Sequence, residues 1–169
     1  MIKFLCVLVV FFAIGYALEK KAEFTKARFI KGINYPGLTI KIKNDKTEFT
    51  WNEPISVDKN SLRATFIIKF TNLNKIESVD LDNLCGTNEK ASFKESVQLF
   101  ILKTIADVNT CPIKKGTQAT FSVPSAFSYT MNGNLCGPFR SEMKVFRKKD
   151  NGNTNPLFTG MFEGNITGC

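Results

Sequence analysis

The chain has 169 residues, a net charge of +8 and a hydrophobic content of 43%, a composition typical of a folded protein and not of a disordered one. It contains no histidine, which excludes Ser-His-Asp and Cys-His nucleophiles and histidine metal sites. The lysines alternate with carboxylates and form no long basic run, which argues against a nucleic-acid partner. Solubility explains the charge, with attraction to an anionic membrane surface as the alternative.

Residues 1–17 have the features of a secretion signal. One early charge, Lys3, precedes an unbroken apolar run from Phe4 to Ile14, and Gly15 and Ala17 are the small residues that signal peptidase reads. A signal anchor is the alternative, but the run is short for a bilayer span. The sequence therefore predicts an exported protein, extracellular or in the lysosomal lumen, whose mature part, residues 18–169, is a single domain.

Extended segments dominate the first half of the mature chain. Apolar and polar residues alternate over 38–42 and again from Thr47 to Trp51, on either side of an Asn44-Asp45 turn, so 38–51 is predicted to be a β-hairpin. Residues 62–70 show the clearest alternation and predict a strand. A turn at 72–75 then leads into a further extended segment, 76–81.

One segment breaks this pattern. Between Ser92 and Val108 the apolar residues are spaced by three, four and seven, which is typical of an amphipathic helix. Ser92 and Glu95 have the spacing of a capping box, which predicts that the helix starts there. Its polar face is predicted to carry Lys94, Glu95, Gln98 and Lys103.

The rest of the chain is again extended. The predicted strands are 118–123, which precedes Pro124, 125–131, which precedes an Asn132-Gly133 turn, 139–147 and 157–167. A polar turn around Asn151-Gly152-Asn153 joins the last two into a hairpin. In the predicted register Phe139 faces Ile166 and Met143 faces Phe162, so the apolar residues of both strands share one face.

The cysteines indicate disulfides. Loss of the signal removes Cys6 and leaves four cysteines, an even number suited to an oxidising compartment. One pair closely brackets the helix, and the hairpin brings the other pair face to face. Of the three possible connectivities we therefore predict Cys85–Cys111 and Cys136–Cys169.

Asn165-Ile166-Thr167 is the one standard N-glycosylation sequon. In the predicted hairpin Asn165 lies on the face opposite Phe162 and Ile166, where a glycan would stand in solvent. Its position near the C-terminus speaks against its use, so Asn165 is a candidate glycosylation site with occupancy left open.

Phenylalanine is the dominant aromatic residue, with 16 in the chain. An ordinary aromatic core is one explanation. The other is a cavity lined by rings, which need no hydrogen bond and suit an acyl chain or a sterol. Gly160 and Gly164 lie on the predicted inward face, which favours the cavity because they remove side-chain volume there.

The segment Cys111-Pro112-Ile113-Lys114-Lys115-Gly116-Thr117, followed by an alternating strand and Pro124, resembles the Cys-Pro-(Phe/Leu)-Lys-x-Gly stretch of ganglioside-activator-like proteins. These belong to the ML lipid-recognition superfamily, together with an insect chemosensory branch. The resemblance is specific over residues 85–124 and continues as a looser match of pattern through 167. It implies an immunoglobulin-like β-sandwich or cup around an apolar cavity, and lipid binding without catalysis.

The same resemblance implies the Cys85–Cys111 pairing and a helical segment near the cavity mouth that contributes Phe93, Val97, Phe100 and Ile101. Ganglioside activators carry a further cysteine near the mature N-terminus, which this chain lacks. Lipid carriage is therefore expected here, rather than enhancement of a lysosomal glycosidase.

We therefore expect a mainly β sandwich or cup with one amphipathic helix, which acts as a monomer and holds a lipid or another hydrophobic small molecule without catalysis, metal or cofactor. Two alternatives remain open: a secreted interaction or adhesion module with a solid core, and a hydrolase that uses two carboxylates. Lys114 and Lys115 are candidate contacts for an anionic headgroup or membrane, or else a solvated turn. The predicted cavity-lining residues are Phe66, Ile68, Phe93, Val97, Phe100, Ile101, Phe121, Phe139, Phe158 and Phe162.

Overall fold

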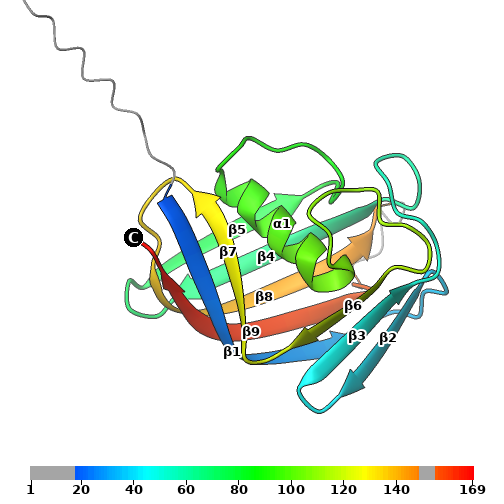
Figure 1. Cartoon of the computed structure of the whole chain (residues 1–169), viewed down its shortest axis with the longest axis horizontal. Helices are drawn as coiled ribbons and strands as arrows, with labels where there is room; N and C mark the ends of the chain where they lie inside the picture. The colour runs from blue at the N-terminus through cyan, green and yellow to red at the C-terminus, as the bar shows by residue number, and fades with distance from the viewer. Residues whose placement is uncertain (1–17, 149–154) are drawn as a thin grey trace, which may run out of the picture.

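The computed structural model describes residues 18–148 and 155–169. The predicted secretion signal and the predicted turn at Asn151-Gly152-Asn153 lie outside these ranges. The described chain is mainly β with one helix, and its strands form two antiparallel sheets arranged as a curled sandwich or cup (Figure 1). The fold class expected from the sequence is confirmed.

The larger sheet has the strand order β5-β4-β8-β9-β1-β7 and the smaller one the order β2-β3-β6. Every strand predicted above is present, with ends that differ by one or two residues at most. The larger sheet consists of β1 (Leu18–Lys31), β4 (Leu62–Phe70), β5 (Lys75–Leu81), β7 (Ser125–Met131), β8 (Gly137–Arg147) and β9 (Phe158–Thr167). The smaller sheet consists of β2 (Leu38–Lys43), β3 (Lys46–Trp51) and β6 (Gln118–Ser122).

β1 is the one strand that the sequence analysis did not predict, and it lies inside the sheet, between β9 and the edge strand β7. A β-bulge between Phe24 and Lys26 shifts its register with β9. Ala22 and Phe24 face the core before the bulge, and Ala27 and Phe29 pack on the core after it. The bulge therefore changes the phase of the two-residue period and hides the strand in the sequence.

α1 (Phe93–Ala106) lies across the concave face of the large sheet and packs against β5, β6 and β7 (Figure 1). The Ser92 hydroxyl accepts the backbone N–H of Glu95 at 3.1 Å, which confirms the predicted start of the helix. The Glu95 carboxylate accepts the N–H of Ala91 at 2.6 Å, one residue before the usual position in a capping box.

Gln98 corrects the predicted polar face of α1, because its side chain is buried and not turned to solvent. The loop before the helix folds over this side chain. Its amide nitrogen donates to the carbonyl oxygens of Leu84 and Gly86 at 2.8 and 2.6 Å, and its amide oxygen accepts from Asn88 at 2.8 Å. A polar residue at this helical position is thus compatible with burial because all its hydrogen bonds are made.

Both predicted disulfides are present. Cys85 and Cys111 are joined with their Cα atoms 5.4 Å apart, and Cys136 and Cys169 with theirs 6.0 Å apart. The first bridge ties together the two loops that flank α1. The second ties the loop before β8 to Cys169, two residues after the end of β9, across the open end of that strand pair.

The β8–β9 register differs from the predicted one by two residues. Phe139 pairs with Gly164 and Met143 with Gly160, not with Ile166 and Phe162. A shift of two keeps the side-chain faces, so the prediction that both apolar sets share one face is confirmed. The observed register places a large side chain opposite each glycine, where the predicted one paired two large side chains.

Candidate functional site

The candidate site is a cleft between α1 and the inner face of the large sheet, with a volume of about 40 Å³. Residues of α1 form one wall and residues of five strands form the other. Ser96 and Tyr129 are the only lining residues with a polar side-chain group. The lining consists of Ala22, Phe24, Phe66, Ile68, Phe93, Ser96, Val97, Phe100, Phe127, Tyr129, Phe139 and Ile166.

The cleft unites six of the ten predicted cavity residues: Phe66, Ile68, Phe93, Val97, Phe100 and Phe139. The structure places the other four elsewhere. Ile101 and Phe158 are fully buried in the core, and Phe121 lines a neighbouring pocket. The ring of Phe162 is buried among Phe24, Phe29, Phe100 and Phe121.

The cleft also contains residues that the sequence analysis missed. Ala22 and Phe24 belong to β1, the unpredicted strand, and Phe127 and Tyr129 belong to β7. The alternation of Phe127, Tyr129 and Met131 is visible in the sequence and is the signal that would have found the β7 residues. For β1 the bulge removes that signal.

The hollow is far smaller than the pockets of about 300–1,000 Å³ that hold drug-sized ligands. Gly160 and Gly164 do not open it, which corrects the interpretation given to them above. A Cβ at Gly160 would come within 3.0 Å of the rings of Phe162 and Phe29, and one at Gly164 would lie 3.0 Å from the ring of Phe139. Aromatic rings therefore fill the space beside Gly160, whereas at Gly164 the backbone carbonyl group of Glu23 lies nearer still than the ring of Phe139.

A second pocket, of about 190 Å³, lies where α1 meets β6 and β7. Three of its lining residues, Phe24, Phe100 and Phe127, also line the cleft. Unlike the cleft, this pocket has polar residues around it, among them an ion pair between Lys103 and Asp107 at 2.6 Å. The other lining residues are Thr104, Thr120, Phe121, Ser122, Ser125 and Ala126.

The polar groups of the cleft are neutral. The Ser96 hydroxyl donates to the carbonyl oxygen of Ser92 at 3.1 Å. Burial raises the pKa of Tyr129 to about 12, so its phenol keeps its proton at physiological pH. No aspartate or glutamate lines the cleft, and in the described residues no group of three or more potential metal-ligating side chains is found. The chemistry that this lining offers is hydrophobic contact.

Lys114, Lys115 and Asn165 lie away from the cleft. Both lysines are exposed in the turn before β6, whose Gly116 N–H donates to the carbonyl oxygen of Trp51 at 2.7 Å. Asn165 is exposed on β9, as predicted. No helix in residues 18–148 and 155–169 is both long and apolar enough to cross a membrane.

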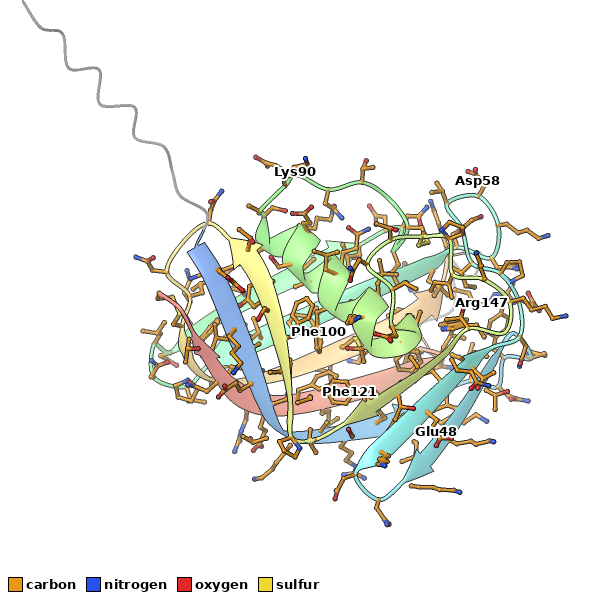
Figure 2. All side chains as sticks on the ribbon, in the orientation of Figure 1. Glu48, Asp58, Lys90, Phe100, Phe121 and Arg147 are labelled. Atoms are coloured by element: carbon orange, nitrogen blue, oxygen red, sulfur yellow. A yellow bond between two sulfur atoms is a disulfide. The ribbon has the colours of Figure 1, made fainter. Side chains whose placement is uncertain are left out.

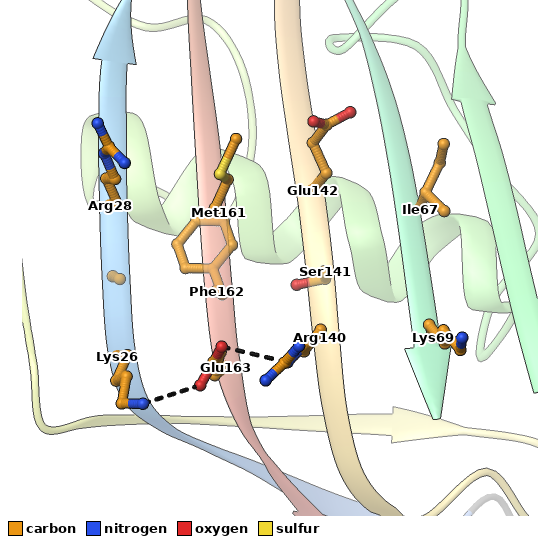
Figure 3. Close-up of a pocket in the computed structure, with 11 residues that line it drawn as sticks. Lys26, Arg28, Ile67, Lys69, Arg140, Ser141, Glu142, Met161, Phe162 and Glu163 are labelled. Atoms are coloured by element: carbon orange, nitrogen blue, oxygen red, sulfur yellow. Dashed lines mark hydrogen bonds and ion pairs between the residues drawn. The ribbon is translucent and has the colours of Figure 1, made fainter. Parts of the chain in front are cut away.

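A larger, open hollow of about 590 Å³ lies on the outer face of the six-stranded sheet, opposite α1 (Figure 3). Glu163 joins its two cationic neighbours Lys26 and Arg140 at 3.2 Å each. Two rows of paired residues cross the strands and form its walls. One row is Arg28, Met161, Glu142 and Ile67, and the other is Lys26, Glu163, Arg140 and Lys69. We call this surface the outer trough.

Comparisons with known proteins do not assign a family. No model of a protein family matches the chain, and no curated protein matches it. A crystal structure of the C-terminal domain of Wzt is 13% identical, over 91% of this chain and 80% of that one, with a TM-score of 0.29. A likeness at this score carries no argument about fold or function.

Proposed function

We propose that the protein is secreted and binds a single-chain hydrophobic molecule in the cleft beneath α1, without catalysis. The observation that carries this proposal is the lining of the cleft, which is apolar on both walls except for Ser96 and Tyr129. Two disulfides suit an oxidising compartment, and the resemblance of residues 111–117 to ganglioside-activator-like proteins of the ML superfamily supports the same role.

Binding requires side chains to move, because a volume of about 40 Å³ holds little more than a methyl group. Phe93, Phe127 and Tyr129 are partly exposed at the edge of the cleft and are the side chains nearest to solvent. Separating one aromatic pair costs about 0.5–1.5 kcal/mol. Each methylene that enters contributes about 0.8 kcal/mol, so a chain of several methylenes outweighs the displacement of one or two rings.

A homologous series of straight-chain alcohols, from hexanol to dodecanol, tests the proposal by displacement of the fluorescent probe N-phenyl-1-naphthylamine. We expect the affinity to rise about fourfold per methylene until the cleft is filled. Ile68→Phe adds volume inside the cleft and should weaken binding. Ile67→Phe is the matched control, because Ile67 is the preceding residue of β4 and its side chain is exposed on the outer face.

The control also reports where the probe binds. Weaker binding in Ile67→Phe with no change in Ile68→Phe would place the alkyl chain of the alcohol in the outer trough and overturn the proposed site. An affinity that does not depend on chain length, or no binding at all, would overturn hydrophobic binding itself. Thermal melting of both variants shows whether a loss of binding comes from the filled cleft or from unfolding of the variant.

A second function, a secreted interaction module with a solid core, is favoured by the small volume of the cleft. The rings around it are in contact, such as Phe24 and Phe100, which stack with centroids 5.0 Å apart. Such a module would present its surface, and not its interior, to a partner. The alcohol series separates the two functions, because a solid core gives no dependence on chain length.

A further inference from the structure

The cleft and the second pocket are separated by aromatic rings and not by backbone. Phe24, Phe100 and Phe127 line both hollows. Phe100 is central to this group: its ring stacks on Phe24 with centroids 5.0 Å apart and meets Phe127 edge to face at 5.7 Å. Figure 2 shows Phe100 in the space between α1 and the sheets, close to Phe121 of β6. The Phe100 ring also meets Phe66 at 6.0 Å and Phe162 at 5.3 Å, so Phe100 is the centre of the aromatic partition between the hollows.

A rotation of the Phe100 ring would not require the helix to move. Its side chain makes aromatic contacts and no hydrogen bond. The helix backbone is fixed further along, where Ile101 and Ile105 are fully buried and the Trp51 indole N–H donates to the carbonyl oxygen of Ile105 at 2.8 Å. A rotation of this one ring would join a hollow of about 40 Å³ to one of about 190 Å³.

The two ends of the joined space differ in polarity. The cleft is apolar, whereas Ser125, Lys103 and Asp107 line the second pocket. The hydroxyl oxygen of Ser125 is buried and has no hydrogen-bond partner within the described residues. Such an atom is rare in a folded protein and indicates a missing partner. Lys103 is already paired with Asp107 at 2.6 Å, so an anionic group there would meet a carboxylate as well as an ammonium group.

We propose that the two hollows are the ends of one channel for a long-chain alcohol, with the alkyl chain in the cleft and the hydroxyl group beside Ser125, and that Phe100 determines which chain lengths are accepted. This inference rests on the proposed function and names its ligand class. A short chain enters the cleft alone, once side chains at its edge have moved. A longer chain turns the Phe100 ring aside and reaches the polar pocket, where a neutral hydroxyl group can partner Ser125, whereas a carboxylate would have to compete with Asp107 for Lys103.

The ratio of dodecanol affinity to hexanol affinity tests the role of Phe100. Phe100→Ala removes the partition, so the ratio should rise at least about tenfold, because the long chain no longer has to separate Phe100 from the four rings it contacts. Phe146→Ala is the matched control, since Phe146 lines neither hollow and packs under the guanidinium group of Arg63, and its ratio should not change. Phe100→Leu provides a second variant if the alanine variant does not fold, with a smaller rise expected.

Ser125 is tested with decanol and decanoate. Ser125→Ala should weaken decanol binding about two- to tenfold, the effect of one hydrogen bond. Ser128→Ala, an exposed serine on the same strand, should leave it unchanged. The wild type should bind decanol more tightly than decanoate.

These results separate the two proposals. If the wild type binds the alcohols but neither Phe100 variant changes the ratio, the channel is overturned and the proposed function stands. Tighter binding of decanoate than of decanol, or no effect of Ser125→Ala on decanol, overturns the position of the hydroxyl group. If no alcohol binds to any variant, both proposals fall.

Discussion

Lys20 points toward the interior although it is the kind of residue that is rarely buried. It precedes Ala22 and Phe24 on the inward face of β1, and its ammonium nitrogen lies 2.9 Å from the Sγ atom of Cys169 and 4.0 Å from that of Cys136. No carboxylate of the described residues forms an ion pair with it. Burial therefore lowers the pKa of Lys20 below its ordinary value of 10.5.

The lowered pKa predicts how stability depends on pH. Between the folded and the unfolded pKa of Lys20 the unfolded chain holds more protons, so the free energy of unfolding rises with pH in that range. Below the folded pKa the cost of burying the charge is fully present. Lys20→Met removes this cost, so we expect it to raise the melting temperature at pH 6–7 and the gain to shrink as the pH approaches 10.5.

Thermal melting between pH 6 and pH 9.5 measures this effect. Lys21→Met is the control, because Lys21 is exposed and pairs with Glu23 at 2.7 Å. Its melting temperature should change little at any pH. A Lys20→Met variant that is less stable than the wild type across the whole range would show that the contact with the disulfide sulfur outweighs the cost of burial.

At the scale of elements, the two halves of α1 have different neighbours. Its C-terminal half carries Ile101, Leu102 and Ile105, all buried, and the hydrogen bond from Trp51. Its N-terminal half faces the cleft with Phe93 and Val97. The Cys85–Cys111 bridge joins the loops on both sides of the helix, so it fixes how far the helix can move away from the sheet.

Removing that bridge should affect binding as well as stability. The loop-entropy model predicts a loss of about 3–4 kcal/mol for Cys85→Ala/Cys111→Ala and a similar loss for Cys136→Ala/Cys169→Ala, because the two loops differ little in length. Only the first pair flanks α1, so it alone should change the affinity for the alcohol series. Urea unfolding followed by the fluorescence of Trp51, the single tryptophan, measures the stability. Equal affinities in both double variants would contradict the role given to α1.

The elements also show what a sequence pattern can predict. The hairpin of β2 and β3, the strand β4 and the helix each carry an uninterrupted period, and each was predicted. β1 was missed because the bulge after Phe24 joins two short alternating runs that are out of phase. The β8–β9 register was misplaced by two residues because the sequence shows which side chains share a face but not which large residue lies opposite a glycine.

At the scale of the whole molecule, the cleft depends on strands that are distant in the sequence. The sheet brings β1 beside β7, so that Phe24 and Phe127 both approach Phe100. Six of ten cavity residues could be predicted because they lie on the apolar faces of well-patterned elements. The size of the cavity could not, because whether rings interlock or leave space depends on their three-dimensional packing.

The same arrangement separates the interior from the outer face, where the sequon lies. Asn165 pairs in register with Pro138 and is exposed on the side of the sheet away from α1. We expect the protein secreted from a eukaryotic cell to carry a glycan whose mass is lost in Asn165→Gln and kept in Thr167→Ser, which preserves the sequon. The melting temperature and the alcohol affinity of Asn165→Gln should match those of the wild type, because a surface substitution changes stability by less than about 0.5 kcal/mol. Mass spectrometry measures the glycan, thermal melting the stability and the alcohol titration the affinity. A loss of alcohol binding in Asn165→Gln would show that the outer face and the cleft are not independent.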